Sequence, residues 1–226
     1  MGSFLSRPVL ARVLPFMLFM ILLAVRGYWP AGGLLGIDAR WVYGLSVLLV
    51  GGSLAFFWKD YTELARPALP GKWTVCLSVL VGLVVFGLWI NLAEPWMMLG
   101  EATASFHPVD SEGRLEWDLV VVRWIGAALM VPVMEELFWR SFLMRWVDKP
   151  AFEQVDPGSV SAKAMALSTI VFMLAHTQWL AAIVAGLAYA YLYKRSGSLW
   201  APVIAHGVTN GVLGIWVVLT GHWAFW

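Results

Sequence analysis

The chain has little charge and only one cysteine. Asp, Glu, Lys and Arg make up 13% of its 226 residues, whereas hydrophobic residues make up 61%. This balance is typical of an integral membrane protein. A lone cysteine, Cys76, excludes a disulfide framework and any metal site built from several cysteines. Because the formal net charge is only +1, the sequence offers no basic excess and predicts no nucleic-acid partner.

Long apolar runs predict seven membrane spans. A helix needs about 17–25 largely apolar residues to cross a bilayer. The runs cover residues 9–27, 40–58, 73–98, 119–143, 163–180, 180–194 and 199–220. Gly- and Pro-rich joints such as WPAGG and RPALPG separate several of them. We therefore expect an all-α polytopic membrane protein, a bundle of about seven to eight transmembrane helices.

The domain organisation expected from these runs is a single integral membrane domain, 1–226. Residues 1–118 hold the upstream spans and a polar, acidic loop from Glu101 to Asp118. Residues 119–220 hold nearly all the polar motifs found within spans. We therefore expect the functional residues in the second part.

Lys and Arg are unevenly divided between the two sides of the expected membrane. Cytoplasmic loops carry an excess of these residues, so the richer side predicts a cytoplasmic N-terminus and an external C-terminus. The eleven residues on the richer side are Arg7, Arg12, Lys59, Arg66, Lys72, Arg140, Arg145, Lys149, Lys163, Lys194 and Arg195. The four on the other side are Arg26, Arg40, Arg114 and Arg123.

Two adjacent carboxylates stand inside the fourth expected span, in the segment EELFWR. Ionisable side chains within spans usually face the bundle interior or a water-filled cavity and mark functional sites. Glu136 and Arg140 are four residues apart, so the spacing predicts an ion pair on one helix face. Glu135 points about 100° away and is left available as a general base. The alternative is a structural one, in which the ion pair is buried and Glu135 reaches towards water.

Two later spans add imidazoles and a carboxamide at similar depth. FMLAH places His176 four residues after Phe172, and AHGVTN places His206 and Asn210 on one helix face. Counted from the expected cytoplasmic ends, Glu135 and His206 lie roughly 12 and 11 Å deep. Asn210 and His176 lie roughly 17 and 19 Å deep by the same rise. A single buried histidine is more often a hydrogen-bonding group between helices, but the shared depth favours one site.

These residue types suit the hydrolysis of an amide. A Glu and a His can deprotonate a water and later protonate the leaving amine. A His and an Asn one turn apart can donate two hydrogen bonds to a developing oxyanion. In the alternative, Glu135, His176 and His206 hold a hydrolytic Zn²⁺. Because the sequence has no HExxH motif, we prefer a site with no metal and no other cofactor and keep Zn²⁺ as the alternative.

At these residues the chain resembles the CPBP family of intramembrane proteases, which comprises CAAX proteases and bacteriocin-processing enzymes. The family motifs EExxxR, FxxxH and HxxxN occur in order, at 135–140, 172–176 and 206–210. Each motif is short, but three in sequence on expected spans are specific. The resemblance covers about residues 119–220, the expected catalytic core.

The resemblance implies a glutamic-type endopeptidase that cuts a peptide bond near the membrane interface. It implies that Glu135 and His176 activate water and that His206 and Asn210 stabilise the oxyanion. It also implies a helical core with a conical cavity that opens to the cytoplasm and the bilayer. The supporting residues would be Glu136, Arg140 and Phe172.

Longer stretches, among them PVMEELFWRSFLMRW and TGHWAFW, resemble a branch of CAAX-protease-related proteins found in bacteria with exosortase (PEP-CTERM) systems. That branch implies a bacterial inner membrane, a membrane-associated or exported protein substrate, and a functional link to an exosortase. A second class is a non-catalytic scaffold or chaperone that binds peptide in the same groove. A third is a proton-relay transporter, against which the lack of an internal repeat counts.

Overall fold

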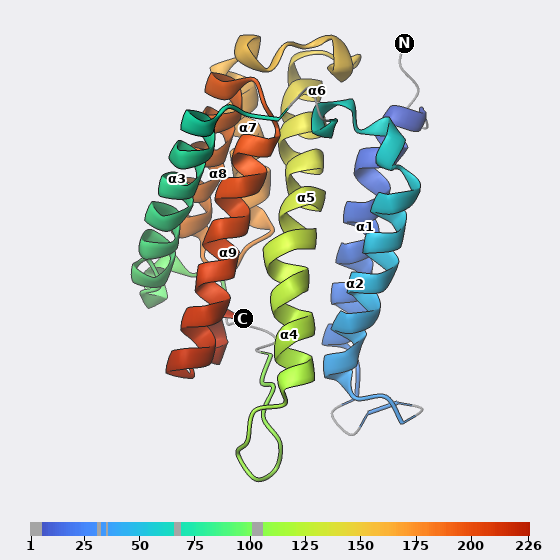
Figure 1. Ribbon diagram of the computed structural model, residues 1–226, viewed down its shortest axis with the longest axis vertical. Helices are drawn as coiled ribbons and strands as arrows, with labels where there is room; N and C mark the ends of the chain where they lie inside the picture. The colour runs from blue at the N-terminus through green and yellow to red at the C-terminus, as the bar shows by residue number, and fades with distance from the viewer. Residues whose placement is uncertain (1–5, 31–32, 35, 66–68, 101–105) are drawn as a thin grey trace.

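The computed structural model describes residues 6–30, 33–34, 36–65, 69–100 and 106–226. The described residues form a bundle of helices that lie roughly along one direction (Figure 1). Arg66 and Glu101, which entered the charge count and the expected acidic loop, lie outside the described residues. Within these ranges no strand is formed, and only two isolated bridges occur, at Leu34–Ile37 and Val109–Leu115.

The helices follow the apolar runs of the sequence. An antiparallel pair, α1 (Arg7–Gly27) and α2 (Ala39–Phe56), flanks a central helix in three parts: α4 (Trp117–Ile125), α5 (Val131–Glu136) and α6 (Arg145–Asp148). On its other side lie α3 (Lys72–Asn91), α7 (Ala162–Leu174), α8 (Trp179–Ser196) and α9 (Trp200–Thr220). The central helix therefore separates two groups of helices and contacts both.

Five helices in the described part of the chain are long and apolar enough to cross a membrane, namely α1, α2, α3, the continuous segment Trp117–Asp148 and α9. The protein is thus an all-helical polytopic membrane protein. The expected count of seven spans is not confirmed, because α7 has 13 residues and measures about 20 Å, short of a hydrocarbon core of about 30 Å. The 18 residues of α8 include Lys194 and Arg195 in the last turn, which reduce its apolar character.

The helix that carries the two glutamates is longer and less regular than expected. It runs for 32 residues and contains two π-helical stretches, Gly126–Met130 and Leu137–Met144. Pro132 has no N–H to donate to the preceding turn, so a wider turn directly before it is physically reasonable. Glu135 and Glu136 lie between the two stretches. Such π-helical turns occur frequently at functional sites.

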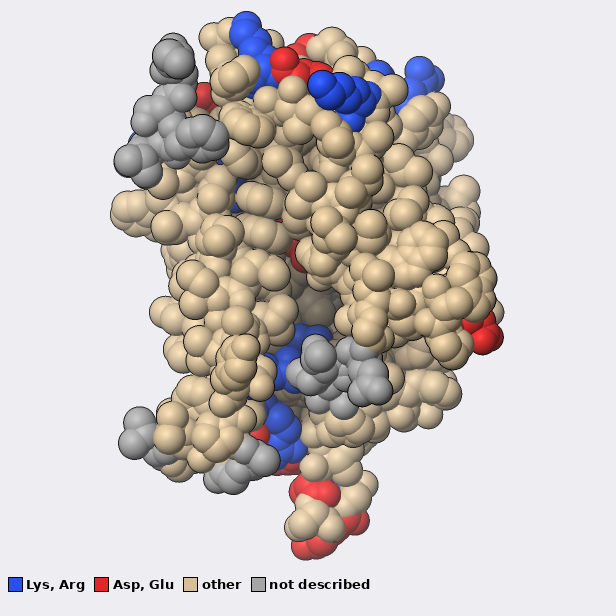
Figure 2. All heavy atoms as spheres, turned by 180° about the vertical axis from the view of Figure 1, so that it is seen from behind, with Lys and Arg blue, Asp and Glu red and all other residues tan. Residues whose placement is uncertain are grey.

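Basic side chains gather at one end of the bundle, which we call the basic end. It is the end where α1 begins and α6 stops, and Figure 2 shows its Lys and Arg side chains at the top. There Arg12 is almost fully buried and donates to both carboxylate oxygens of Glu63, at 2.9 and 2.7 Å. Burial is the largest single influence and raises the pKa of Glu63, but the hydrogen bonds and charge of Arg12, the hydrogen bond from Ser141 and a backbone hydrogen bond together outweigh it, so the pKa lies below its ordinary value. Ser141 joins this network through Arg12 and Arg145, which fixes α1 against the glutamate-bearing helix.

Helices α3 and α9 approach each other closely at Gly82. A Cβ at this position would collide with the carbonyl oxygen of Ala205 and lie 2.8 Å from Cβ of Val208. The hydroxyl of Thr209 donates to the carbonyl oxygen of Gly82 at 2.8 Å. Small residues permit such contacts between membrane helices. The contact positions the middle of α9, where His206 lies.

We expect Gly82→Ala to destabilise the protein by about 1–3 kcal/mol, because the added methyl group must push α3 and α9 apart. The measurement is thermal unfolding in detergent. Gly87→Ala is the matched control, since a Cβ at Gly87 meets nothing within 4 Å on the same helix. Equal melting temperatures for the two variants would contradict the close contact.

Candidate active site

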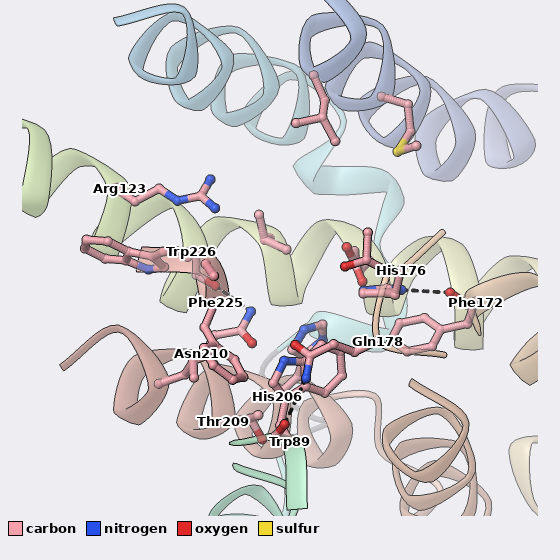
Figure 3. Close-up of a pocket in the computed structure, with 18 of the residues that line it drawn as sticks. Trp89, Arg123, Phe172, His176, Gln178, His206, Thr209, Asn210, Phe225 and Trp226 are labelled. Atoms are coloured by element: carbon pink, nitrogen blue, oxygen red, sulfur yellow. Dashed lines mark hydrogen bonds between the residues drawn. The ribbon is translucent and has the colours of Figure 1, made fainter. Parts of the chain in front are cut away.

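A cavity of about 700 Å³ lies beside the central helix. Its wall includes Glu135 from α5, His176 from the segment after α7, and His206 and Asn210 from α9. Figure 3 shows the labelled members of this set, His176, His206 and Asn210, around the same pocket. The structure thus brings together the four residues for which the sequence predicts catalytic roles.

The two adjacent glutamates face different surroundings. Glu135 lines the cavity, and its Oε2 is buried without a hydrogen-bond partner in the described part of the chain. Glu136 has 0% of its surface exposed and does not line the cavity. The rotation of about 100° per residue explains this divergence. Only Glu135 is therefore placed to meet a substrate.

Glu136 is held between two cationic or potentially cationic groups. The expected ion pair with Arg140 is present, with Nε 3.1 Å from Oε2. The geometry is bent too far for a hydrogen bond, so this contact is mainly electrostatic. Nδ1 of His206 lies 2.9 Å from Oε1 of Glu136, a contact that spacing within one helix could not reveal. Glu136 therefore orients His206 as well as balancing Arg140.

His176 is fixed by its own helix end. Its Nδ1 lies 2.7 Å from the carbonyl oxygen of Phe172, and because a carbonyl can only accept, Nδ1 carries the proton. In the neutral ring Nε2 then keeps its lone pair. The ring of Phe172 packs against His176 with centroids 4.3 Å apart. Phe172 thus forms part of the cavity wall.

The carboxamide of Asn210 and the ring of His206 are also oriented. Nδ2 of Asn210 donates to the carbonyl oxygen of Ala127 at 2.9 Å, within the first π-helical stretch. One of its two N–H groups therefore remains for a ligand. His206 stacks on Tyr189 with ring centroids 5.2 Å apart. The hydroxyl of Tyr189 is in turn within 2.7 Å of Oγ1 of Thr209.

Several cavity residues were missed by sequence reasoning. Tyr189 and Thr209 carry no local signal, because their role depends on packing between α8 and α9. Gln178 donates to the carbonyl oxygen of Trp89 at 2.9 Å and joins α3 to the segment after α7. Arg123 had a usable signal, namely a charged side chain inside the apolar run VVVRWIGAA. In the charge bias it is one of the four arginines on the poorer side.

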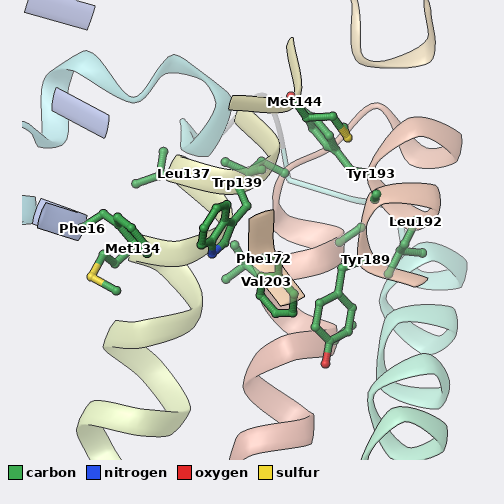
Figure 4. Close-up of a cluster of buried hydrophobic side chains, with 14 of the residues drawn as sticks. Phe16, Met134, Leu137, Trp139, Met144, Phe172, Tyr189, Leu192, Tyr193 and Val203 are labelled. Atoms are coloured by element: carbon green, nitrogen blue, oxygen red, sulfur yellow. The ribbon is translucent and has the colours of Figure 1, made fainter. Parts of the chain in front are cut away.

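The expected cytoplasm-facing cavity is not confirmed. From Glu135 the cavity extends along α4 and the last turns of α1 to Gly27, Tyr28 and Trp226, away from the basic end. Towards the basic end the interior is filled by large buried side chains, among them Leu137, Trp139, Met144 and Tyr193 (Figure 4). On the face drawn in Figure 2, a hollow at mid-height has acidic and basic atoms within it. If the basic end is cytoplasmic, as the charge bias predicts, the cavity leads to the other side and to the bilayer.

Glu135, His176 and His206 are not arranged as a metal-binding cluster. In the parts of the chain that the structure describes, no group of three or more His, Cys, Asp or Glu side chains is arranged to hold a metal ion. Nδ1 of each site histidine is already engaged, by Phe172 or by Glu136.

A helical membrane bundle with a Glu, two His and an Asn around one cavity defines a candidate membrane-embedded hydrolase. Residues 117–212 match the family model described as Type II CAAX prenyl endopeptidase Rce1-like. All seven candidate residues lie within this segment. The match supports the resemblance to the CPBP family and, in general terms, a CAAX-type membrane protease. Comparison with curated proteins gave no match, and comparison with solved structures gave none either.

Proposed function

We propose that the protein is a glutamic-type intramembrane endopeptidase. The observation that carries the proposal is the convergence of Glu135, His176, His206 and Asn210 on one cavity, within the segment that matches the protease family. The substrate is a peptide segment of a membrane-associated or exported protein. Hydrolysis takes place inside the bundle, where water reaches the site through the cavity.

Glu135 and His176 activate the water in this proposal. Glu135 accepts a proton from the water, and the resulting hydroxide attacks the carbonyl carbon of the scissile bond. Glu135 lines the cavity, and its Oε2 makes no hydrogen bond in the described structure that would compete with this water. His176, with its Nε2 lone pair, relays the proton to the departing amine as the C–N bond breaks.

His206 and Asn210 stabilise the oxyanion. The second N–H of Asn210 donates one hydrogen bond, and Nε2–H of His206 donates the other. If Glu136 is ionised it accepts from Nδ1 of His206, so donation from Nε2 as well uses both N–H groups of the ring. Glu136 supplies the counter-charge and Arg140 balances it in turn. A single buried carboxylate thus supports the oxyanion site without touching the substrate.

We also propose an orientation. The basic end faces the cytoplasm of a bacterial cell, so the N-terminus is cytoplasmic and the cavity is reached from the bilayer and the opposite side. Helices α7 and α8 act as two further, shorter crossings. Nε1 of Trp179 donates to the carbonyl oxygen of Trp96 at 3.1 Å, which anchors the start of α8 to the short turn Pro95–Met97 that follows α3. Access from that side suits an exported substrate and a link to an exosortase system.

The proposal is tested with purified protein in liposomes and a set of quenched-fluorescence peptides, each a short apolar segment. We expect at least one peptide to be cut, with product masses that identify a single bond. Binding of peptides without any product would favour the scaffold alternative.

Removal of divalent metal ions should leave this hydrolysis unchanged. We expect rates within about twofold after treatment with EDTA or 1,10-phenanthroline, because Glu135 and His176 activate water without a Lewis acid. A known zinc protease in the same liposomes is the control for effective chelation. Loss of activity that added Zn²⁺ restores would contradict the metal-free mechanism.

A further inference from the structure

The cavity contains a second charged side chain, Arg123, which the proposed mechanism does not use. Arg123 belongs to α4 and lines the same cavity as Glu135. Figure 3 shows its guanidinium at the far end of the drawn pocket from His176. Arg123 and Glu135 are 12 residues apart on one helix, which corresponds to roughly 18 Å.

The guanidinium of Arg123 is held by aromatic rings rather than by a carboxylate. Its Cζ lies 4.3 Å from the ring centroid of Tyr43 and 5.5 Å from that of Phe106. Gly126 permits this arrangement, because a Cβ there would lie 2.6 Å from the hydroxyl oxygen of Tyr43. Rings that cover the face of a guanidinium leave its N–H edges free to bind an anion.

Nothing described in the structure neutralises Arg123. Its Nε is buried without a hydrogen-bond partner, and no described carboxylate forms a salt bridge with it. By contrast, Arg12, Arg40 and Arg140 each contact a carboxylate. Holding a cation in a largely apolar cavity costs free energy, and an anionic ligand offsets that cost.

We propose that Arg123 binds a carboxylate of the substrate. This inference rests on the proposed peptidase function and narrows its substrate class. An extended peptide advances about 3.3–3.6 Å per residue, so a span of roughly 18 Å corresponds to about five residues. The favoured substrate therefore carries a carboxylate, either an acidic side chain or the C-terminus, about five residues from the bond that is cut. Guanidinium and carboxylate match as a bidentate pair, which also fixes the register of the peptide.

The test is a binding experiment that needs no turnover. The Glu135→Gln variant in nanodiscs is titrated with fluorescent twelve-residue Ala/Leu peptides that differ in one group. In the first pair, one peptide ends in a carboxylate and the other in an amide. In the second pair both peptides end in an amide, and one carries Asp and the other Asn five residues from the centre. We expect the acid of at least one pair to bind at least about tenfold more tightly than its neutral partner.

Arg123→Met in the same background should remove this selectivity. Arg114→Met is the matched control, because Arg114 is exposed, pairs with Asp110 and Glu112, and does not line the cavity. Should Arg123→Met fail to fold, Arg123→Gln provides the same comparison with a neutral donor. The comparison of acid with neutral peptides on the Glu135→Gln protein, which keeps Arg123, tests the proposal without any change at this position.

The outcomes separate this inference from the proposed function. Cleavage by the wild type with equal affinity for acid and neutral peptides would overturn the carboxylate site and leave the peptidase standing. Arg123-dependent selectivity without cleavage of any peptide would support the site and remove the peptidase. Arg123-dependent binding of labelled phosphatidylglycerol, with no selectivity between peptides, would assign the arginine to a lipid headgroup and overturn the proposal.

Discussion

Glu135→Gln should abolish peptide hydrolysis and leave the protein folded. The substitution removes the proton acceptor for water, and loss of a general base costs about 10²–10⁴-fold in rate. The side chain keeps its shape, and the buried Oε2 loses no hydrogen bond in the described structure, so we expect a change in stability below about 1 kcal/mol. The measurements are initial rates in liposomes and the melting temperature in detergent.

Glu94→Gln is the control for this variant. Glu94 is an exposed acid beyond the end of α3 and does not line the cavity. We expect its rate to equal that of the wild type. Wild-type rates for Glu135→Gln as well would mean that another group activates the water.

Glu136→Gln should behave differently from its neighbour. The variant leaves Arg140 and His206 in a buried site without their shared counter-charge. Removing one partner of a buried ion pair typically costs about 3–5 kcal/mol. We therefore expect a large fall in melting temperature together with loss of activity, because His206 loses the carboxylate that orients it.

A second substitution separates the charge effect from a packing effect. In the double variant Glu136→Gln/Arg140→Met, the uncompensated arginine is gone, so we expect part of the lost stability to return. Unfolding in denaturing detergent measures both variants and the single Arg140→Met. If the stability losses of the two single variants simply add in the double variant, Glu136 and Arg140 do not stabilise each other. A Glu136→Gln variant as stable as the wild type would contradict the role of Glu136 as the shared counter-charge.

The helical fold was largely predictable because apolar runs and their joints are local signals. The first two expected spans, 9–27 and 40–58, correspond to α1 and α2 with ends shifted by one or two residues. The third was expected to reach residue 98, but α3 ends at Asn91, since Pro95 begins a separate short turn, Pro95–Met97. The fifth expected span was to reach residue 180, but α7 ends at Leu174, and the segment that follows is held by contacts such as Gln178 with Trp89, which no local pattern encodes.

The site was predictable where residues share one helix and less so where helices meet. The four-residue spacing of Glu136 and Arg140 predicts their ion pair, which is present. Neither the bond from His206 to Glu136 nor the stack on Tyr189 could be predicted, because each joins residues of different helices. The depth of the motifs indicated convergence but could not show on which side the cavity opens, since that depends on which side chains fill the other end.

The most direct test of the shared site is an experimental structure of Glu135→Gln with an uncut peptide that the wild type hydrolyses. The proposed mechanism predicts the scissile carbonyl oxygen about 3 Å from Nδ2 of Asn210 and Nε2 of His206. It also predicts a water molecule between the residue at 135 and His176. A peptide bound outside the cavity, or with its scissile carbonyl turned away from α9, would contradict the proposed catalysis.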